Sequence, residues 1–204
     1  MSNRSQHWEK IYETKQQEEF SWYQKRPETS LNLIRGMNLP KDAAIIDIGG
    51  GDTFLVDFLL ADGFSNITVL DVSVKALERA QNRLGEKAET VKWITADISE
   101  YISEEKYDVW HDRAALHFLI KEDEVQKYLQ NLRNSVKSNG FVILGTFSEN
   151  GPTRCSGLPI RQYSQQDLKQ LLKDSFTPLK CLSEDHITPG GSTQNFNYCS
   201  FRKK

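Results

Sequence analysis

Short apolar runs alternate with longer amphipathic segments along the middle of the chain. The runs are rich in β-branched and aromatic residues and predict strands at 43–47, 67–71, 90–94, 107–111 and 140–147. The segments between them carry apolar residues at the spacing of one helix face. They predict helices over 53–63, 72–85 and 121–140, each closed by a glycine. This alternation is typical of βαβ units and predicts an α/β fold with a mostly parallel sheet.

The last quarter of the chain has a different pattern. Residues 163–176 predict a helix that begins at Ser164, with Asp167 placed to form a capping box. Strand-like runs at 179–185 and 194–202 follow, and a TPGGS turn signal separates them. They predict a C-terminal antiparallel hairpin that completes a seven-stranded sheet.

The N-terminal segment is rich in aromatic residues. Residues 7–37 predict one or two helices packed over the edge of the sheet. Trp8 and Tyr12 are four positions apart and therefore lie on one face of a helix. That face could pack on the core or close as a lid over a bound ligand.

Composition and charge narrow the class of protein. At 204 residues the chain is long enough for one well-buried core without a second domain. A formal net charge of −2 and a pI near 6.1 give no electrostatic reason to expect nucleic acid or an anionic membrane as partner. The N-terminus has no apolar signal region, and no apolar run approaches the roughly 20 residues of a membrane span. We therefore expect a cytoplasmic protein, either a monomer or a homodimer.

The number and spacing of the cysteines do not indicate a disulfide framework. The chain has 3 of them, widely spaced and without a C-x-x-C pair. This usage fits a reducing compartment better than a set of disulfides. Cys155, His186 and Cys199 match no standard zinc spacing, so we expect no metal.

A glycine-rich turn follows the first predicted strand. It reads Asp47-Ile-Gly49-Gly50-Gly51-Asp52 and suits close approach of the backbone to a ligand. The dinucleotide fingerprint requires a glycine at the sixth position from Gly49, and that position is Phe54. Asp52 also lies where a pyrophosphate would bind to the helix N-terminus. The turn therefore favours a nucleotide ligand without a phosphate.

Acidic residues follow the second and third strands. Asp71 ends the second strand and precedes Val72; a carboxylate there can accept both ribose hydroxyls of an adenosine. Asp97 follows the third strand, where it can accept from an adenine amine while Ile98 packs on the ring. Asp71 is hard to explain structurally, whereas Asp97 could also be a turn residue.

This order of residues resembles the class I S-adenosylmethionine-dependent methyltransferases. Their pattern of strand-end acids and glycines corresponds to Asp47, Gly49, Gly51, Asp71 and Asp97. The resemblance covers essentially the whole chain. Two positions depart from it, because Thr53 replaces a third glycine and Gly50 replaces a cysteine or small residue.

The resemblance implies a Rossmann-like fold, S-adenosyl-L-methionine as cofactor and methyl transfer by SN2 displacement. Trp22 and Tyr23 lie where similar enzymes contact the amino acid head of the donor. We expect a single domain over 1–204. It comprises a helical lid or cap (1–40), a cofactor-binding core (41–147), and an acceptor-side loop, helix and hairpin (148–204).

Polar residues concentrate after the fourth strand, which faces the donor's sulfonium in this family. His111 or His117 could act as a base, Asp112 could bind a cationic substrate, and Arg113 could bind a carboxylate. The alternative interpretation is structural: Asp112 and Arg113 pair with each other, and each histidine is a satisfied core residue.

The sequence leaves the acceptor open. The nucleobase methyltransferase signature is absent, which argues against nucleic acid. The run Phe-Ser-Asn-Ile-Thr at 64–68 is similar to lysine methyltransferases that modify translation factors. We expect a protein lysine or a small molecule as acceptor. The alternatives are a small acid or thiol, with Arg113 or Arg154 binding the anion, or a non-catalytic cofactor-binding protein.

Overall fold

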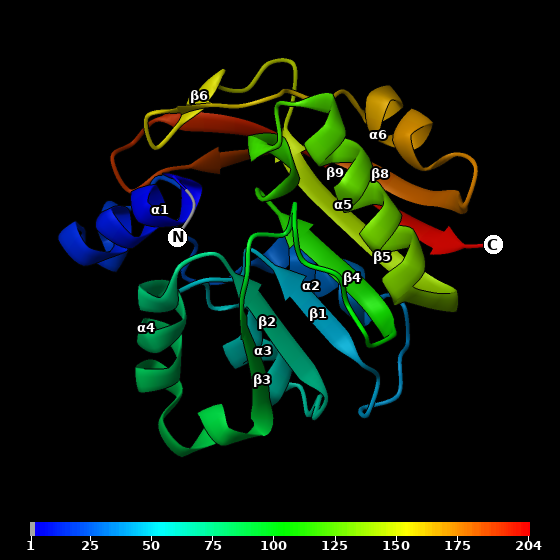
Figure 1. Ribbon diagram of the computed structural model, residues 1–204, viewed down its shortest axis with the longest axis horizontal. Helices are drawn as coiled ribbons and strands as arrows, with labels where there is room; N and C mark the ends of the chain where they lie inside the picture. Colours follow the sequence, from blue (N-terminus) through cyan, green and yellow to red (C-terminus); the bar gives the residue numbers. More distant parts are fainter. Residues whose placement is uncertain (1–2) are drawn as a thin grey trace.

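A seven-stranded sheet with the order β3-β2-β1-β4-β5-β9-β8 forms the centre of the molecule (Figure 1). The computed structural model describes residues 3–204. The five strands from β3 to β5 are parallel, and β9 pairs antiparallel with both β5 and β8. The predicted fold is therefore confirmed. The strands are β1 (Ile45–Ile48), β2 (Ile67–Asp71), β3 (Val91–Thr95), β4 (Tyr107–Arg113), β5 (Val136–Phe147), β8 (Phe176–Ile187) and β9 (Thr193–Lys203).

Helices cover both faces of the sheet. In Figure 1, α5 lies in front of β4 and β5, whereas α2 and α3 lie behind the sheet. The helix α6 shares the α5 side, and α4 shares the side of α2 and α3. The α-helices are α1 (Asn3–Thr14), α2 (Glu28–Arg35), α3 (Leu55–Ala61), α4 (Val74–Leu84), α5 (Glu122–Ser135) and α6 (Gln165–Leu172). Short 3-10 helices are η1 (Gln17–Glu19), η2 (Gly85–Thr90) and η3 (Leu116–Phe118).

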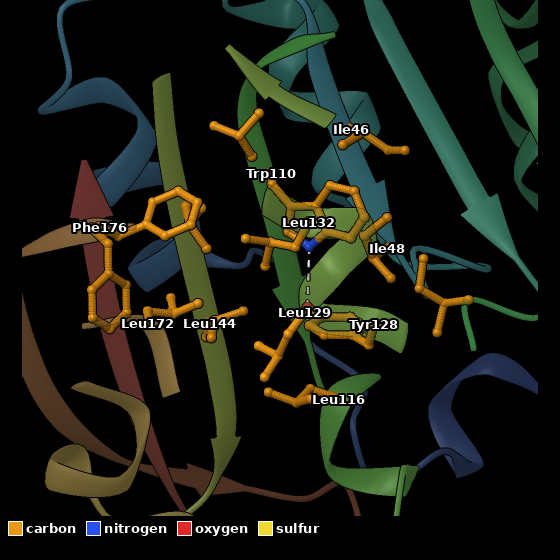
Figure 2. Close-up of a cluster of buried hydrophobic side chains, with 14 of the residues drawn as sticks. Ile46, Ile48, Trp110, Leu116, Tyr128, Leu129, Leu132, Leu144, Leu172 and Phe176 are labelled. Carbon is orange, nitrogen blue, oxygen red and sulfur yellow. Dashed lines mark hydrogen bonds between the residues drawn. The ribbon is translucent and has the colours of Figure 1, made fainter. Parts of the chain in front are cut away.

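A hydrophobic core forms on each face of the sheet because successive side chains of a strand point to opposite faces. Ile46 of β1 packs with Trp110 in the core under α5, whereas Ile45 packs in the core under α2 and α3. Figure 2 shows the first core, where the indole of Trp110 donates to the Tyr128 hydroxyl at 3.1 Å. The central strands β1 and β4 are thereby buried on both faces. The order in which the chain adds strands to the sheet reverses between these two strands.

The structure differs from the sequence prediction at the boundaries of several elements, among them β4, which continues to Arg113. The helix predicted over 121–140 ends at Ser135, because Val136 begins β5 and pairs with Tyr107 of β4. The predicted loop at 151–164 contains a small hairpin, β6 (Arg154–Cys155) and β7 (Leu158–Pro159). The capping box of α6 at Ser164 and Asp167 is confirmed.

The expectation that the cysteines form no disulfide is wrong for one pair. Cys181 and Cys199 are joined by a disulfide. They are directly opposite each other in the β8–β9 ladder, with Cα atoms 4.1 Å apart. Strand register, which spacing along the chain does not reveal, brings them together. Cys155 is free and buried.

None of the helices within residues 3–204 is long and apolar enough to cross a membrane.

Candidate cofactor and acceptor site

The turn after β1 has the backbone geometry of a ligand cradle. Gly49 and Gly51 have φ angles of +66° and +43°, which side chains rarely adopt. A Cβ on Gly51 would lie 2.8 Å from both Asp71 Oδ2 and Tyr12 Oη. A Cβ on Gly49 would lie 2.9 Å from the Cβ of Ala115 after β4. Glycine is therefore required where this turn approaches the ends of β2 and β4.

Asp71 is buried at the end of β2. Its Oδ1 accepts from the Ser73 amide at 2.9 Å, and its Oδ2 borders the space that a Gly51 side chain would fill. Burial raises the pKa of this carboxyl to about 7, and the charge of Asp47 adds to the effect. A carboxylate kept in so unfavourable an environment is poised to accept hydrogen bonds from a ligand.

The first cavity extends from the end of β2 to β9 under α1. Its β2 side is formed by Leu70, Asp71 and Val72. Side chains of α1 cover it. Its full lining is Arg4, Trp8, Tyr12, Trp22, Gly49, Thr53, Leu70, Asp71, Val72, Ala96, Ile98, Arg113, Ala114, Ala115, Phe118, Leu119, Phe147, Cys155 and Phe196.

A second cavity adjoins the first and shares Trp22, Gly49, Thr53 and Arg113 with it. It lies between the glycine turn, the segment before α2, and the end of β4. The remaining residues of its lining are Gln17, Phe20, Tyr23, Gln24, Pro27, Ser30, Asp47, Gly50, Asp52, Phe54, Leu55 and His111.

Helix α1 is fixed across the site by polar contacts to the strand ends below it. The Glu9 carboxylate accepts from the amides of Val74 and Lys75 at 2.6 and 3.1 Å, and therefore caps the N-terminus of α4. Gln17, after α1, donates to the Asp52 carbonyl at 2.7 Å. Trp8 packs against Trp22 and Phe118, with ring centroids 5.6 and 5.1 Å apart.

The carboxylate of Asp97 has hydrogen-bond partners within the protein. Nη1 of Arg4 in α1 donates to both of its carboxylate oxygens, at 2.8 and 2.9 Å. The Ser99 amide and hydroxyl donate to Oδ1 as well, and Nη2 of Arg4 donates to Glu124. Ile98 lines the first cavity, but Asp97 does not. The predicted contact of Asp97 with an adenine amine is therefore not prepared by the cavity lining, and it stays a prediction.

Asp112 and Arg113 do not pair with each other. The strand β4 extends through Arg113, so the two side chains point to opposite faces of the sheet. Asp112 is fully buried and accepts from the Tyr128 hydroxyl at 2.7 Å and the Ala115 amide at 2.9 Å. Burial raises its pKa to about 6. Arg113 extends to the other side, where its Nε donates to the Tyr198 hydroxyl at 2.8 Å.

Both predicted histidines are buried. His111 donates from Nδ1 to Asp47 at 2.6 Å, and its Nε2 is hydrogen-bonded to the Ser30 hydroxyl at 2.8 Å. The ring of His117 has no exposed surface, and its Nδ1 accepts from the Phe147 amide at 3.2 Å. Burial, and secondarily the charge of Arg113, lowers the pKa of His117 to about 3. Neither histidine lines the first cavity.

The other acidic residues of the glycine turn have protein partners. Asp47 lies under Gly50, where any Cβ would be 2.6 Å from its Oδ2. Asp52 forms ion pairs with Arg83 and Arg79 of α4. Burial raises the pKa of Asp52, and these two arginines oppose the shift. Among residues 3–204, no three or more His, Cys, Asp or Glu side chains are grouped so as to hold a metal ion.

Comparison with known families names the domain that contains this turn. The sequence profile of a methyltransferase domain matches residues 46–142, which contain the glycine turn and the ends of β2, β3 and β4. The fold is that of the class I S-adenosylmethionine-dependent methyltransferases. The predicted family and its cofactor class are confirmed.

The relatives of this methyltransferase act on different acceptors. The zebrafish (Danio rerio) EEF1A lysine methyltransferase 2 is 26% identical over 174 residues, which cover 81% of this chain and 68% of that protein. A ubiquinone biosynthesis O-methyltransferase of Rickettsia felis is 28% identical over 119 residues, 58% of this chain and 47% of that one. The chain thus spans about half the length of the rickettsial relative. The fold matches the N-methyltransferase NodS of Bradyrhizobium japonicum, solved with S-adenosyl-L-homocysteine, with a TM-score of 0.75 over 99% of both chains at 16% identity.

The residues of this methyltransferase fit an adenosyl donor. The cradle of Gly49 and Gly51 leaves room that side chains would fill, and Asp71 offers a buried acceptor beside it. Arg4 and Phe196 are lining residues that the sequence analysis missed. No local sequence pattern predicts that they line one cavity, because they come from opposite ends of the chain. The spacing of Trp8 and Tyr12 was the one signal that α1 faces a ligand.

Proposed function

We propose that this chain transfers a methyl group from S-adenosylmethionine to a small-molecule acceptor bound in the first cavity. The observation that carries the proposal is the position of α1, which covers this cavity with Arg4, Trp8 and Tyr12. A protein segment carrying the acceptor would have to pass this helix, whereas a small molecule fits beneath it. The proposed lid is the predicted 1–40 segment, closed over the core.

The cavity linings support a proposed place for each part of the donor. Asp71 and Val72 would hold the ribose, and Ile98 would pack on the adenine. The amino acid head would lie in the second cavity, beside Tyr23 and Trp22. When bound, S-adenosylmethionine supplies a methyl group on a sulfonium, which becomes a thioether once an acceptor lone pair attacks the methyl carbon.

The chain's own residues would act by alignment and by excluding water. Trp8, Phe118, Phe147 and Phe196 surround the acceptor end of the first cavity with aromatic surface. We propose positioning roles for the two residues predicted as base and cation binder. His111 orients Asp47 beneath the glycine turn, and Asp112 holds the amides of the segment after β4.

A protein lysine is the second candidate acceptor. It is favoured by the zebrafish lysine methyltransferase, whose similarity extends over 81% of this chain. The two candidates differ in which molecules would carry the transferred methyl group.

Transfer of isotope from methyl-labelled S-adenosylmethionine distinguishes them. The protein is incubated with the labelled donor and a cell lysate, and ultrafiltration then separates proteins from small molecules. We expect label in a small molecule other than the donor, after chromatographic separation of that fraction, and none in such a molecule with the Asp71→Ala variant. Label in a protein band would support the lysine acceptor. Label in neither a protein nor a new small molecule, with retained S-adenosylhomocysteine binding, would support a non-catalytic binding protein.

A further inference from the structure

The guanidinium of Arg113 is only partly satisfied by the protein. Nε donates to Tyr198 at 2.8 Å, and Nη1 donates to the Trp22 carbonyl at 3.1 Å. Nη2 is buried and has no hydrogen-bond partner. The ion pairs found within residues 3–204 do not include Arg113. A buried charged donor without a partner is costly, and a ligand anion would satisfy it.

We propose that Arg113 is the binding site for a carboxylate carried by the methyl acceptor. This inference rests on the proposed function and narrows its substrate to a small acid. Arg113 lines the first cavity together with Phe147, Cys155 and Phe196. Its guanidinium carbon lies 4.8 Å from the centroid of the Phe196 ring. The site therefore combines a fixed cation with an aromatic wall, which suits an acid with a flat or apolar body.

The acceptor's carboxylate must be distinguished from that of the donor's amino acid head, because Arg113 borders both cavities. Two of its three contacts favour the acceptor, because Tyr198 and Phe196 both belong to β9, on the far side of β5 from the glycine turn. The third contact, to the Trp22 carbonyl, lies on the side proposed for the donor's head, so the two carboxylates need a direct test.

The other charged groups near Arg113 do not pair with it. Glu184 of β8 acts electrostatically on Tyr198 and His186, as Arg113 does, but it is not within ion-pair distance of Arg113. Asp47 and Asp52 of the second cavity have other partners, and Arg4 of the first cavity is paired with Asp97 and Glu124. Burial and Arg113 keep His186 and His117 toward the neutral form by lowering the pKa of each. Arg113 therefore remains a cation available to a ligand here. A lysine ammonium would be repelled at this position.

Isothermal titration of the S-adenosylhomocysteine-loaded full chain with benzoate tests the proposal, with benzamide as the neutral probe of the same shape. We expect benzoate to bind wild type more tightly than benzamide, and Arg113→Met to weaken benzoate binding roughly tenfold or more. Arg113→Lys should keep part of the preference. Arg202→Met removes a positive charge at an exposed position that lines neither cavity, so it should retain the preference and is the matched control. Equal binding of the two probes by wild type would overturn the proposal without any variant.

The donor's own carboxylate is tested with a second pair of ligands. S-adenosylhomocysteine carries the amino acid head and 5′-methylthioadenosine lacks it. We expect Arg113→Met to leave the affinity ratio of this pair unchanged. Loss of that ratio would assign Arg113 to the donor and overturn the inference. If wild type binds neither adenosyl ligand, the proposed function fails. The benzoate titration of the unloaded chain then still decides whether Arg113 binds an anion.

Discussion

Arg4 and Asp97 form an ion pair in which a single guanidinium nitrogen donates to both carboxylate oxygens. The two residues lie at the start of α1 and just after β3, and both side chains are largely shielded from water. The pair connects the proposed lid helix to the carboxylate that the family pattern assigns to adenine.

Arg4→Met should loosen α1. A charged hydrogen bond of this kind contributes about 1.5–3 kcal/mol, so the opening equilibrium should rise on the order of tenfold. Hydrogen exchange of the α1 amides, measured by mass spectrometry, should accelerate accordingly, and S-adenosylhomocysteine should dissociate faster. The control is Lys92→Met, which removes an exposed ion pair to Glu105. Equal exchange in α1 of the two variants would show that Arg4 does not hold the lid.

Asp71→Asn should separate ligand binding from stability. The folded-state pKa of Asp71 is raised to about 7, so the folded protein holds this proton more tightly than the unfolded chain. Stability is therefore lost as pH rises from about 4 through 7. The variant removes this loss, and its melting temperature at pH 8 should exceed that of wild type.

Binding of the donor should have the opposite pH dependence, because the ionised Asp71 accepts ribose hydroxyls best. Wild-type affinity for S-adenosylhomocysteine should rise about tenfold between pH 6 and 8. Asp71→Asn should bind weakly at both pH values. A wild-type affinity that does not change over this range would contradict the assignment of Asp71 to the ribose.

Gly51→Ala should impair the cradle specifically. The new Cβ would lie 2.8 Å from Asp71 Oδ2 and Tyr12 Oη, at a φ of +43°. Gly157→Ala is the matched control, because Gly157 also has a positive φ but has nothing within 4 Å of a Cβ. Both variants carry about 1 kcal/mol of backbone strain. Only Gly51→Ala should lose S-adenosylhomocysteine binding by calorimetry, and equal affinities would show that the cradle does not contact the ligand.

Tyr128→Phe should lower stability with little effect on binding. The Tyr128 hydroxyl donates to Asp112 and accepts from Trp110 in the buried core of Figure 2. Its removal leaves two buried polar groups short of a partner and should cost about 1–3 kcal/mol in urea unfolding. Tyr101→Phe, at a partly exposed site, should cost much less. A loss of donor affinity without a loss of stability would instead place Asp112 in the binding site.

The sequence alone determined the fold and the cradle. Alternating apolar runs and amphipathic segments are local patterns, and the capping box at Ser164 is a contact within one helical turn. The glycine turn and Asp71 were predictable for the same reason: each follows directly from the end of a strand. The carboxyl ends of parallel strands lie at the same edge of a sheet, so residues that directly follow these strands lie close together.

Only the tertiary structure decided which partner each polar group has. Arg4 reaches Asp97 although 93 positions separate them in the chain, and Cys181 meets Cys199 through the register of β8 and β9. The sequence ended the fourth strand at residue 111, whereas β4 continues to Arg113 and sends Asp112 to the opposite face. Such pairings depend on packing between distant segments, and no local pattern encodes it. Only the positions of its neighbours in the folded structure show that Arg113 Nη2 has no hydrogen-bond partner.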